Sequence, residues 1–591
     1  MQTDWAPKRS LAEVDTILCG PGSIHETEVC LVDGTLQRVF KNLWPSLRAF
    51  WLWASHEHLN TTYVVFEKQR LTFSDVLQHS IRAAAVYQDV FGIKKGDRVA
   101  ICSRNYPEYL VAFWACHLIG AVSVLVNAWL PIETMRYCLT HTQSKLIILD
   151  AERADRVEPV IREVFLDAHS TGCMVLESHE GKGSWRGMKN WKDTMNEFNG
   201  DINMVLKNDP VIIPEDNATI IFTSGTTGQP KGVLSTQRMY LTNVLNVLVA
   251  GRRAILRRGG DIPDTIIPDA PQKGILVSVP LFHVTGLNSH SMLASIAGIK
   301  IVFMRKWIPE EAARLIQEEN ISIAGGVPSM VSDLIERSGR VNILETLMFG
   351  GASPPNILAE KARVAFPAAT MSQGYGLTET NSVAVSVAGE DYISRPSSCG
   401  RPTLVNDIVI VSGNLVVPSG TVGEVWLRGP NIMKGYWNDP DATEKALTKD
   451  GWLRTGDLGV LDKEGFLHIK DRIKDIIIRG GENIDSVSVE NALYADERVY
   501  EAAAVGVPHK RLGEVVAAVV YVKPENRGQV TEASLMAIAS KSLPKFAVPV
   551  MIVFLHEPFE RTPSGKILKG DLRTLARKAW STRNKEPTSK L

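Results

Sequence analysis

Short apolar stretches alternate with amphipathic stretches along most of the chain. Residues 71–105 ("LTFSDVLQHSIRAAAVYQDVFGIKKGDRVAICSRN") predict a helix, a glycine turn and then a strand. Further strands are predicted in "KLIILD", "GILVSVP", "IKIVFM" and "ISIAGGVP", with amphipathic segments between them. This alternation is typical of largely parallel sheets covered by helices, so we predict an α/β fold. The first roughly sixty residues lack the pattern and are expected to be irregular.

One uncharged stretch, residues 109–132, is long enough to cross a membrane. However, Gly120 divides "YLVAFWACHLIGAVSVLVNAWLPI" into a helix-like half and a β-branched half, and Asn127 and Pro131 follow. We therefore expect a buried helix, a tight turn and a core strand, with no transmembrane span. Peripheral contact with a membrane stays open.

Two later regions differ from this pattern. Residues 406–428 carry short strands separated by Gly and Pro, which predict a small antiparallel or barrel-like module. Beyond Asp471 the chain has strands of its own in "EAAAVGV" and "EVVAAVVYV", which predict a separate α+β unit. A chain of 591 residues exceeds a single core, so two or more domains are expected, and no internal repeat is present.

Composition argues against several functional classes. Lys+Arg and Asp+Glu both number 65, so no overall charge attracts nucleic acid, and no nucleic-acid partner is expected. The 7 cysteines are widely spaced without a Cys-x-x-Cys pair, which argues against a zinc site or a disulfide framework and fits a reducing compartment. Asp4 and Glu13 stand where a secretory signal needs an unbroken apolar stretch.

The most informative stretch is residues 218–232, "ATIIFTSGTTGQPKG", in which an apolar strand leads into glycines, hydroxyl residues and Lys231. Glycines let backbone N–H groups converge on an anion, hydroxyls add donors and Lys231 adds charge, so we predict a phosphate-binding loop. It is not a Walker loop, because Gly232 follows Lys231 where Ser or Thr is required. The next helix is predicted to be capped by Ser235.

"TSGTTGQPKG" resembles the signature loop of the adenylate-forming superfamily, which comprises acyl-CoA synthetases, adenylation domains and beetle luciferases. The resemblance implies ATP-dependent activation of a carboxylate to an acyl-adenylate, with CoA as cosubstrate of the ligases. It also implies that the loop binds the phosphates of ATP and that Thr226 and Glu379 bind Mg²⁺. The loop residues assigned in this way are Thr223, Ser224, Gly225, Thr226, Thr227, Gly228 and Lys231.

Three further motifs follow in the order of that family. "PLFHVTG" (280–286) resembles the segment whose histidine, here His283, lies beside the carboxylate. "GGASPP" (350–355) resembles the adenine-facing loop, and "QGYGLTET" (373–380) resembles the segment whose tyrosine stacks on adenine and whose glutamate, here Glu379, holds Mg²⁺. A flat base needs an aromatic face and a hard cation needs a carboxylate. The resemblance assigns nucleotide contacts to Gly351, Ala352, Ser353, Gln373, Gly374, Tyr375, Gly376, Leu377 and Thr378.

The remaining motifs lie toward the C-terminus. "GWLRTGDLG" (451–459) places Asp457 where family members bind the ribose hydroxyls, and "DRIKDIIIRGGENI" (471–484) supplies Arg472 as a second ribose and phosphate contact. Lys474 falls at the family's hinge, and "RTPSGKILK" (561–569) makes Lys566 the catalytic lysine. The resemblance implies a large domain (1–471) of two α/β sheet subdomains and a small β-barrel, a hinge (472–475), a small mobile α+β domain (476–586) and a tail (587–591).

Family members rotate the small domain between two half-reactions. In the first, Lys566 is expected near the carboxylate and the α-phosphate, where negative charge is shared. In the second, Lys566 withdraws and "RGGEN" comes to the entrance, so that Gly480 and Gly481 let a thin pantetheine arm pass and Arg479 meets a CoA phosphate.

The identity of the acid is left open. The expected walls of the acyl pocket are Phe282, Thr285, Gly286, Val327 and Met330, whose size permits a long chain or a compact aromatic acid. A medium- or long-chain fatty acid is favoured, with an aromatic or secondary-metabolite acid as the alternative. A luciferase-type oxidoreductase and an enzyme that charges a carrier protein share the same first step and are ranked lower.

Two positions depart from the family pattern, and the last three residues carry a separate signal. Gln237 stands where many members have histidine, and Ser486 stands where proline is frequent. The final Ser589-Lys590-Leu591 matches the tripeptide read by the peroxisomal import receptor. An acyl-CoA ligase belongs where β-oxidation consumes its product, so we expect the peroxisomal matrix.

Overall fold

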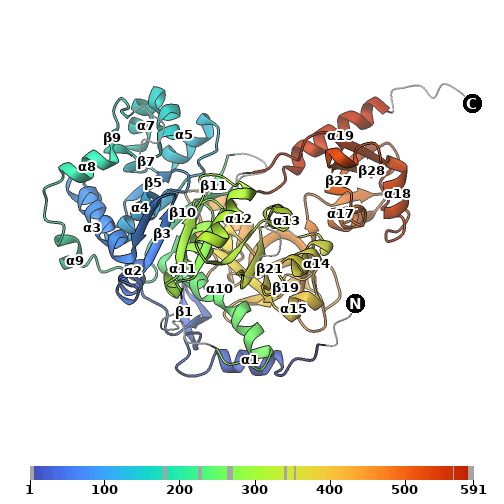
Figure 1. The fold of residues 1–591 in the computed structure, drawn as a ribbon, viewed down its shortest axis with the longest axis horizontal. Helices are drawn as coiled ribbons and strands as arrows, with labels where there is room; N and C mark the ends of the chain where they lie inside the picture. Colours follow the sequence, from blue (N-terminus) through green and yellow to red (C-terminus); the bar gives the residue numbers. More distant parts are fainter. Residues whose placement is uncertain are drawn as a thin grey trace, which may run out of the picture.

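A computed structural model of the protein describes residues 5–176, 183–223, 229–262, 271–337, 343–351, 354–562 and 565–583. The described chain forms a large body and a small C-terminal unit, which is red in Figure 1 and lies at one end of the molecule. Helices cover mixed sheets in the large body, so the predicted α/β class is confirmed. The seven cysteines are all free thiols.

The first sheet of the large body has eight strands, and its strands from β10 to β9 are parallel. Its apolar strands are buried on both faces, as expected of parallel strands between helices. In sheet order the strands are β22 (Gly435–Tyr436), β11 (Lys231–Thr236), β10 (Asn217–Thr223), β6 (Val122–Leu125), β5 (Arg98–Cys102), β7 (Leu146–Leu149), β8 (Gly172–Val175) and β9 (Lys189–Asn190).

The second sheet has nine strands and contains most of the predicted apolar strands that follow the phosphate loop. Its strands from β16 to β3 are parallel, and antiparallel strands close both edges. In order they are β18 (Arg401–Pro402), β17 (Ser382–Ala388), β16 (Thr370–Leu377), β15 (Thr346–Gly350), β14 (Ile321–Gly326), β12 (Gly274–Val277), β13 (Lys300–Phe303), β3 (Thr62–Phe66) and β4 (Gln69–Thr72).

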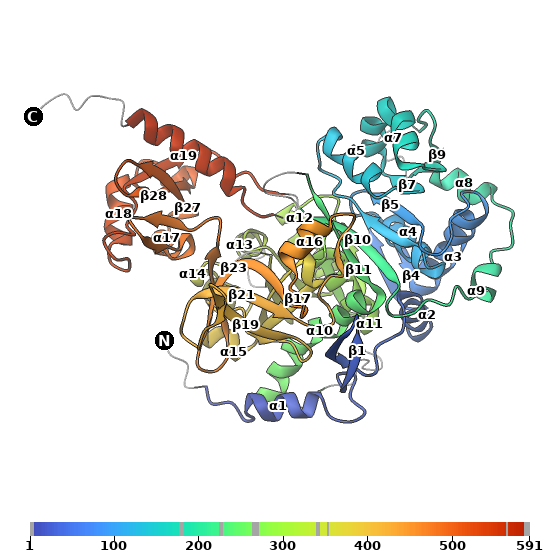
Figure 2. The ribbon, with the colours of Figure 1, turned by 180° about the vertical axis from the view of Figure 1, so that it is seen from behind.

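The small module predicted around residues 406–428 is a five-stranded antiparallel sheet, seen from behind in Figure 2. Its strands are β20 (Leu415–Val416), β19 (Asp407–Ser412), β21 (Gly423–Arg428), β23 (Leu453–Leu461) and β24 (Leu467–Arg472). The α+β C-terminal unit follows with β26 (Glu482–Ile484), β25 (Ile477–Arg479), β28 (Gly513–Val522), β27 (Val499–His509) and β29 (Met551–Leu555), and with helices α17 (Ser486–Leu493), α18 (Glu532–Ala539) and α19 (Lys569–Arg583).

The expectation that roughly the first sixty residues are irregular is wrong. They contain α1 (Leu11–Leu18), the hairpin of β1 (Thr27–Val32) and β2 (Thr35–Phe40), and α2 (Leu47–Glu57). These elements are short, and distant partners hold them in place. Gln237, at the position where many relatives have histidine, accepts a hydrogen bond from the backbone N–H of Leu47 at 2.8 Å. Tertiary contacts of this kind leave no periodic signal in the sequence.

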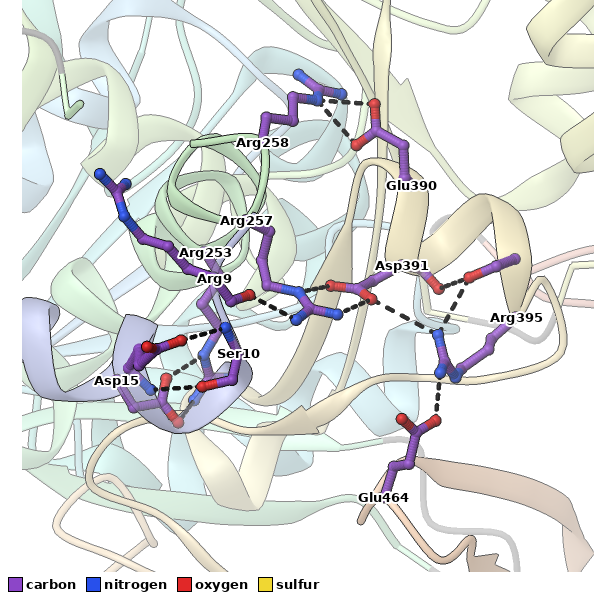
Figure 3. Close-up of polar contacts among 12 residues, drawn as sticks. Arg9, Ser10, Asp15, Arg253, Arg257, Arg258, Glu390, Asp391, Arg395 and Glu464 are labelled. Carbon is purple, nitrogen blue, oxygen red and sulfur yellow. Dashed lines mark hydrogen bonds and ion pairs between the residues drawn. The ribbon is translucent and has the colours of Figure 1, made fainter. Parts of the chain in front are cut away.

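Charged contacts attach the N-terminal segment to α10 (Gln237–Arg257), as Figure 3 shows. Arg253 Nε lies 2.8 Å from Asp15 Oδ1 on α1, and Arg257 Nη1 donates to the backbone oxygen of Arg9 at 2.8 Å. Arg257 also pairs with Asp391 on α15 (Glu390–Ser394), with Nε 2.8 Å from Oδ2. Both members of this pair are buried, so loss of either would leave an uncompensated charge in the interior.

The uncharged stretch at residues 109–132 folds as predicted. Helix α4 (Pro107–Leu118) is buried over its length apart from Glu108, Gly120 turns the chain with φ of 73°, and β6 follows in the sheet core. Glycine suits this turn because L side chains rarely adopt such a φ. Among the described residues, no helix has the length and apolar character that a membrane crossing needs.

Candidate active site

A cavity of about 960 Å³ lies between the large body and the C-terminal unit. Its wall is formed by β-strand ends of the two large sheets, by the antiparallel sheet and by the loop before α19. Sequence motifs separated by hundreds of residues therefore meet around one space. The predicted residues that line it are Thr223, Lys231, His283, Thr285, Val327, Gly351, Gln373, Gly374, Tyr375, Gly376, Leu377, Thr378, Glu379, Asp457, Arg472, Lys474 and Lys566.

Lys566 lies beside Gly351 in the cavity, next to the close contact of Gly565 with Val327. A Cβ on Gly351 would lie 3.7 Å from Cε of Lys566, and Gly565 packs so closely on Val327 that a Cβ there would lie 2.4 Å from its Cγ2. Burial lowers the pKa of Lys566, and the nearby Arg472 lowers it further, whereas Asp457 and Glu379 oppose this effect. The ammonium group thus lies in a partly dry site where its charge acts strongly on bound anions.

Asp457 forms the centre of the wall predicted to bind ribose. Its Oδ2 accepts a hydrogen bond from the Tyr375 hydroxyl at 2.7 Å, and its Oδ1 lies 3.2 Å from Nε of Arg472. Asp457 is only 3% exposed, and this burial raises its pKa, while the charge of Arg472 acts in the opposite direction. The contacts fix the carboxylate in position, with Tyr375 and Arg472 on either side of it.

The phosphate loop joins two antiparallel strands, which differs from the predicted strand–loop–helix order. β10 and β11 pair from Asn217↔Thr236 to Thr223↔Lys231, and α10 begins only after β11. The prediction of Ser235 as the helix cap is also wrong, because the Thr236 hydroxyl accepts the Met239 N–H at 3.3 Å. Ser235 is still in the strand. The predicted loop residues Ser224, Gly225, Thr226, Thr227 and Gly228, and Ala352 and Ser353 of the adenine loop, lie outside the described residues.

Tyr436 is a site residue that the sequence motifs did not reveal. Its hydroxyl donates to Glu379 Oε1 at 2.8 Å, and its ring lies under Nζ of Lys231 at 4.9 Å from the centroid. One aromatic side chain therefore orients both the predicted metal ligand and the lysine of the phosphate loop. Tyr436 follows Glu379 by 57 residues and belongs to a two-residue strand, so no local pattern identifies it.

The chemistry of this wall is compatible with Mg²⁺. Protein sites for Mg²⁺ commonly supply one or two carboxylates and leave the other positions to phosphates and water. Glu379 lines the cavity, and Tyr436 lies between it and Lys231, where phosphates are expected. Among the described residues there is no cluster of three or more His, Cys, Asp or Glu side chains that could hold a metal without a substrate. Glu379, with Thr226 as predicted, would thus hold the ion together with ATP.

His283 lines the cavity at the start of the wall predicted for the acid. Burial lowers its pKa to about 4, and the positive charge of Lys566 contributes, so the imidazole is neutral at pH 7. A π-helix, η2 (Thr285–Ser291), continues from this point. π-Helical turns are rare and occur frequently at functional sites.

Three residues predicted for the acyl wall do not line this cavity. Phe282 is buried in the main hydrophobic core, and Gly286 is pressed against the backbone, where a Cβ would lie 2.3 Å from the Pro280 oxygen. Met330 packs behind Val327, in contact with Val279. The wall is instead completed by residues that were not assigned to it from the sequence. They lie on α10, in the π-helix and directly beside it, and on β17: Val247, Ala250, Val284, Ser289, His290, Leu293, Val383 and Ser386.

Arg479, Gly480 and Gly481 lie away from the cavity, at the turn between β25 and β26. The two glycines have φ of 60° and 93°, and the Gly480 N–H donates to the Leu512 oxygen at 2.7 Å. The structure therefore has Lys566 in the site while the residues predicted to meet CoA are outside it. Ser486, which replaces the usual proline, donates its N–H to Asp471 Oδ2 at 2.6 Å, a bond that proline cannot form.

Comparison with known proteins agrees with this arrangement. Residues 50–437 match the family model "AMP-binding enzyme", and residues 488–566 match "AMP-binding enzyme C-terminal domain". The chain is 30% identical over 510 residues to a long-chain-fatty-acid–CoA ligase, FadD13, of Mycobacterium tuberculosis (85% of this chain, 93% of the relative). It is 31% identical over 509 residues to a feruloyl-CoA synthase of an Amycolatopsis species, with the same coverage.

Among solved structures, o-succinylbenzoate CoA synthetase (MenE) of Bacillus subtilis, in complex with its acyl-adenylate intermediate, superposes with a TM-score of 0.72 at 26% identity. The match covers 90% of this chain and 98% of that chain. It extends over the large body and the C-terminal unit, as do the two family models. The chain therefore belongs to the AMP-binding enzyme family.

Proposed function

We propose that the protein is an ATP-dependent acyl-CoA ligase that converts a hydrophobic carboxylic acid, through an acyl-adenylate, to its CoA thioester. The observation that carries the proposal is that Lys566, Glu379, Asp457 and a neutral His283 line one cavity. The enzyme is an AMP-forming acid–thiol ligase that uses ATP with Mg²⁺ and takes CoA as cosubstrate, as relatives of this family do.

In the first half-reaction a carboxylate oxygen of the acid attacks the α-phosphorus of ATP, and the bond to pyrophosphate breaks. Lys566 places its charge where the carboxylate and α-phosphate oxygens share negative charge, and Lys231 acts on the departing pyrophosphate. Asp457 and Tyr375 orient the nucleoside, so the reaction is promoted mainly by positioning and charge neutralisation. Mg²⁺, which Glu379 would hold, would supply further positive charge for the phosphates.

In the second half-reaction the CoA thiolate attacks the carbonyl carbon of the adenylate, and AMP leaves with the electrons of the acyl–oxygen bond. With Lys566 in the cavity and Arg479 outside it, the arrangement suits the first half-reaction. The second requires the C-terminal unit to turn about the segment around Lys474. A neutral His283 beside the carboxylate can orient an anion without pairing with it too tightly.

For the acid, we propose a medium- or long-chain fatty acid. Among the described residues of the acyl wall, none carries a formal charge. Its apolar side chains are Val247 and Ala250 of α10, Val284, Leu293 and Val383. Such a wall favours an apolar chain and offers no partner to a second carboxylate or an amino group. The alternative is an aromatic acid with polar substituents, favoured by Ser289, His290 and Ser386 in the same wall.

The deciding experiment is a screen of pyrophosphate release with purified protein, ATP and Mg²⁺ over acids of varied chain length and aromaticity, each with and without CoA. Fatty acids of medium or long chain should give the highest kcat/KM, with CoA thioester as the product. Preference for hydroxylated aromatic acids would support the alternative acid. Release of pyrophosphate without a CoA thioester, or light emission with oxygen, would contradict the ligase function.

We further propose that the protein acts in the peroxisomal matrix and is delivered there by the import receptor that reads Ser589-Lys590-Leu591. The proposal is supported by the tripeptide and by the chemistry, because acyl-CoA is the substrate of β-oxidation. Residues 584–591 lie outside the described residues, so the support comes from the sequence alone.

A further inference from the structure

Helix α13 (Pro328–Arg337) bonds the large body to the C-terminal unit through two acidic side chains one turn apart. Asp333 Oδ1 accepts a hydrogen bond from the Tyr500 hydroxyl at 2.8 Å, and Glu336 pairs with Lys523. In both views α13 lies on the side of the large body that faces the C-terminal unit (Figures 1 and 2). Tyr500 and Lys523 lie at the same end of the paired strands β27 and β28.

Both oxygens of Asp333 are engaged, one by each body. While Oδ1 binds Tyr500 of the C-terminal unit, Oδ2 accepts the indole N–H of Trp307 of the large body at 2.7 Å. Trp307 thus holds the carboxylate in the direction of Tyr500. A hydrogen bond to an ionised group is stronger than a neutral one, which makes this contact the best-defined link between α13 and the C-terminal unit.

Tyr500 is itself held in place. Nζ of Lys523 lies 4.8 Å from the centroid of its ring, and Tyr521 packs edge-on against the same ring at 5.9 Å between centroids. Burial raises the pKa of Tyr500, and the charge of Asp333 raises it further, so the hydroxyl keeps its proton and donates it. The ring packing does not depend on the hydroxyl, which allows the hydrogen bond to be removed alone.

The contact lies next to the position where the C-terminal unit delivers its lysine. Helix α13 starts directly after Val327, and Val327 is the cavity residue against which Gly565 packs. Lys566 follows Gly565 and lines the same cavity. Contacts at both ends of this short stretch therefore hold one orientation of the C-terminal unit, with Lys566 in the site and the turn of Gly480 and Gly481 outside it.

We propose that Asp333 and Tyr500, assisted by Glu336 and Lys523, are positioning residues that hold the C-terminal unit in the adenylate-forming orientation and separate before thioester formation. The inference rests on the two half-reactions of the proposed function. A hydrogen bond that forms in only one orientation of the C-terminal unit stabilises that orientation by the free energy of the bond. Loss of the bond should therefore slow adenylate formation and leave thioester formation unchanged or faster. A residue with a merely structural role would affect both steps alike.

The test removes one hydroxyl. Tyr500→Phe should lower adenylate formation, followed as pyrophosphate release from acid and ATP, by roughly 10-fold. Thioester formation from supplied acyl-adenylate and CoA should be unchanged or faster. Tyr521→Phe is the matched control, because it makes the same change on the neighbouring ring, which is not bonded to Asp333, and both rates should stay at wild-type values. Equal loss of both half-reactions in Tyr500→Phe, or no change in either, would overturn the proposal.

The ion pair allows a rescue experiment. Glu336→Lys places two cations together and should lower adenylate formation, whereas the exchange Glu336→Lys with Lys523→Glu restores the attraction and should recover most of the rate. Failure of the double variant to exceed Glu336→Lys would contradict a role for this pair in orienting the unit. Both variants need only the pyrophosphate assay.

A second readout is independent of the acid and of CoA, so failure of the proposed function and failure of this inference can be told apart. The segment between the two bodies contains trypsin sites at Arg472 and Lys474. With ATP present, Tyr500→Phe should be cleaved there faster than the wild type and faster than Tyr521→Phe, because the C-terminal unit leaves the closed orientation more often. Equal cleavage rates in Tyr500→Phe and the wild type would contradict the inference, even if the protein is a fully active ligase.

Discussion

At the scale of single residues, the site depends on one lysine that comes from a different part of the fold than its partners. Lys566 has a lowered pKa because it is buried, and it lies in the same cavity as Asp457, Arg472 and Glu379. Its role follows from its positive charge. The negatively charged carboxylate must approach the negatively charged α-phosphate, and the lysine offsets the repulsion between them. The same argument predicts that the lysine matters in one step only.

Lys566→Ala should lower adenylate formation roughly 100- to 1,000-fold, because a preorganised donor to the developing charge is lost. Thioester formation from supplied acyl-adenylate should stay largely intact. The two half-reactions are measured separately by pyrophosphate release and by CoA consumption. Lys541→Ala, at an exposed lysine of the same unit, is the control and should change neither rate. Equal loss of both half-reactions would exclude this role for Lys566.

At the scale of elements, the phosphate loop connects two antiparallel strands, β10 and β11, and helix α10 starts one strand later than predicted. The sequence "STQRM" offers two hydroxyl residues in succession, and local preference cannot decide which of them caps the helix. The structure decides it, because Thr236 is the last residue of β11 and directly precedes α10, so that its hydroxyl reaches the N–H of Met239. Ser235 lies one residue earlier, opposite Thr219 in the sheet.

Thr236→Ala should lower the free energy of unfolding by about 1 kcal/mol, because the capping hydrogen bond at the start of α10 is lost. Ser235→Ala should have a clearly smaller effect. Urea unfolding of both variants, followed by circular dichroism, compares them directly. A larger loss in Ser235→Ala than in Thr236→Ala would contradict the observed cap.

At the scale of the whole molecule, two bodies share one cavity, so their relative orientation decides which residues face the substrate. In the observed orientation, the pair Asp333–Tyr500 links the bodies and Lys566 is inside the site. The N-terminal segment belongs to the large body, because Asp15 and Arg9 bind the basic face of α10. The tail beyond α19 has no assigned role in the site. Its proposed role is to direct the protein into peroxisomes.

Deletion of Ser589-Lys590-Leu591 from the full chain should leave adenylation and thioester formation unchanged, since these residues follow the last helix and carry no assigned role in the site. In a eukaryotic cell, a fluorescent protein fused to the N-terminus should report peroxisomes for the full chain and cytosol for the deletion. Import of the truncated protein into peroxisomes would contradict the role of these three residues as a targeting signal.

The sequence by itself determined the fold class and the chemical class, because both depend on patterns within short segments of the chain. Strand and helix periodicities give the α/β class, and a glycine- and hydroxyl-rich loop ending in Lys231 indicates a phosphate-binding site whatever surrounds it. Gly120 could be identified as a turn for the same reason, since a break in a uniform apolar stretch is a local signal.

Only the tertiary structure decided which side chains meet. Tyr436 binds Glu379 across 57 residues of chain, Asp333 binds Tyr500 across 167, and the acyl wall combines α10, the π-helix and β17. Phe282 and Met330 carry the apolar character of wall residues but point into packed core, because the direction of a side chain depends on the neighbours of its element. Such contacts arise from packing between distant segments, and packing leaves no pattern within any one of them.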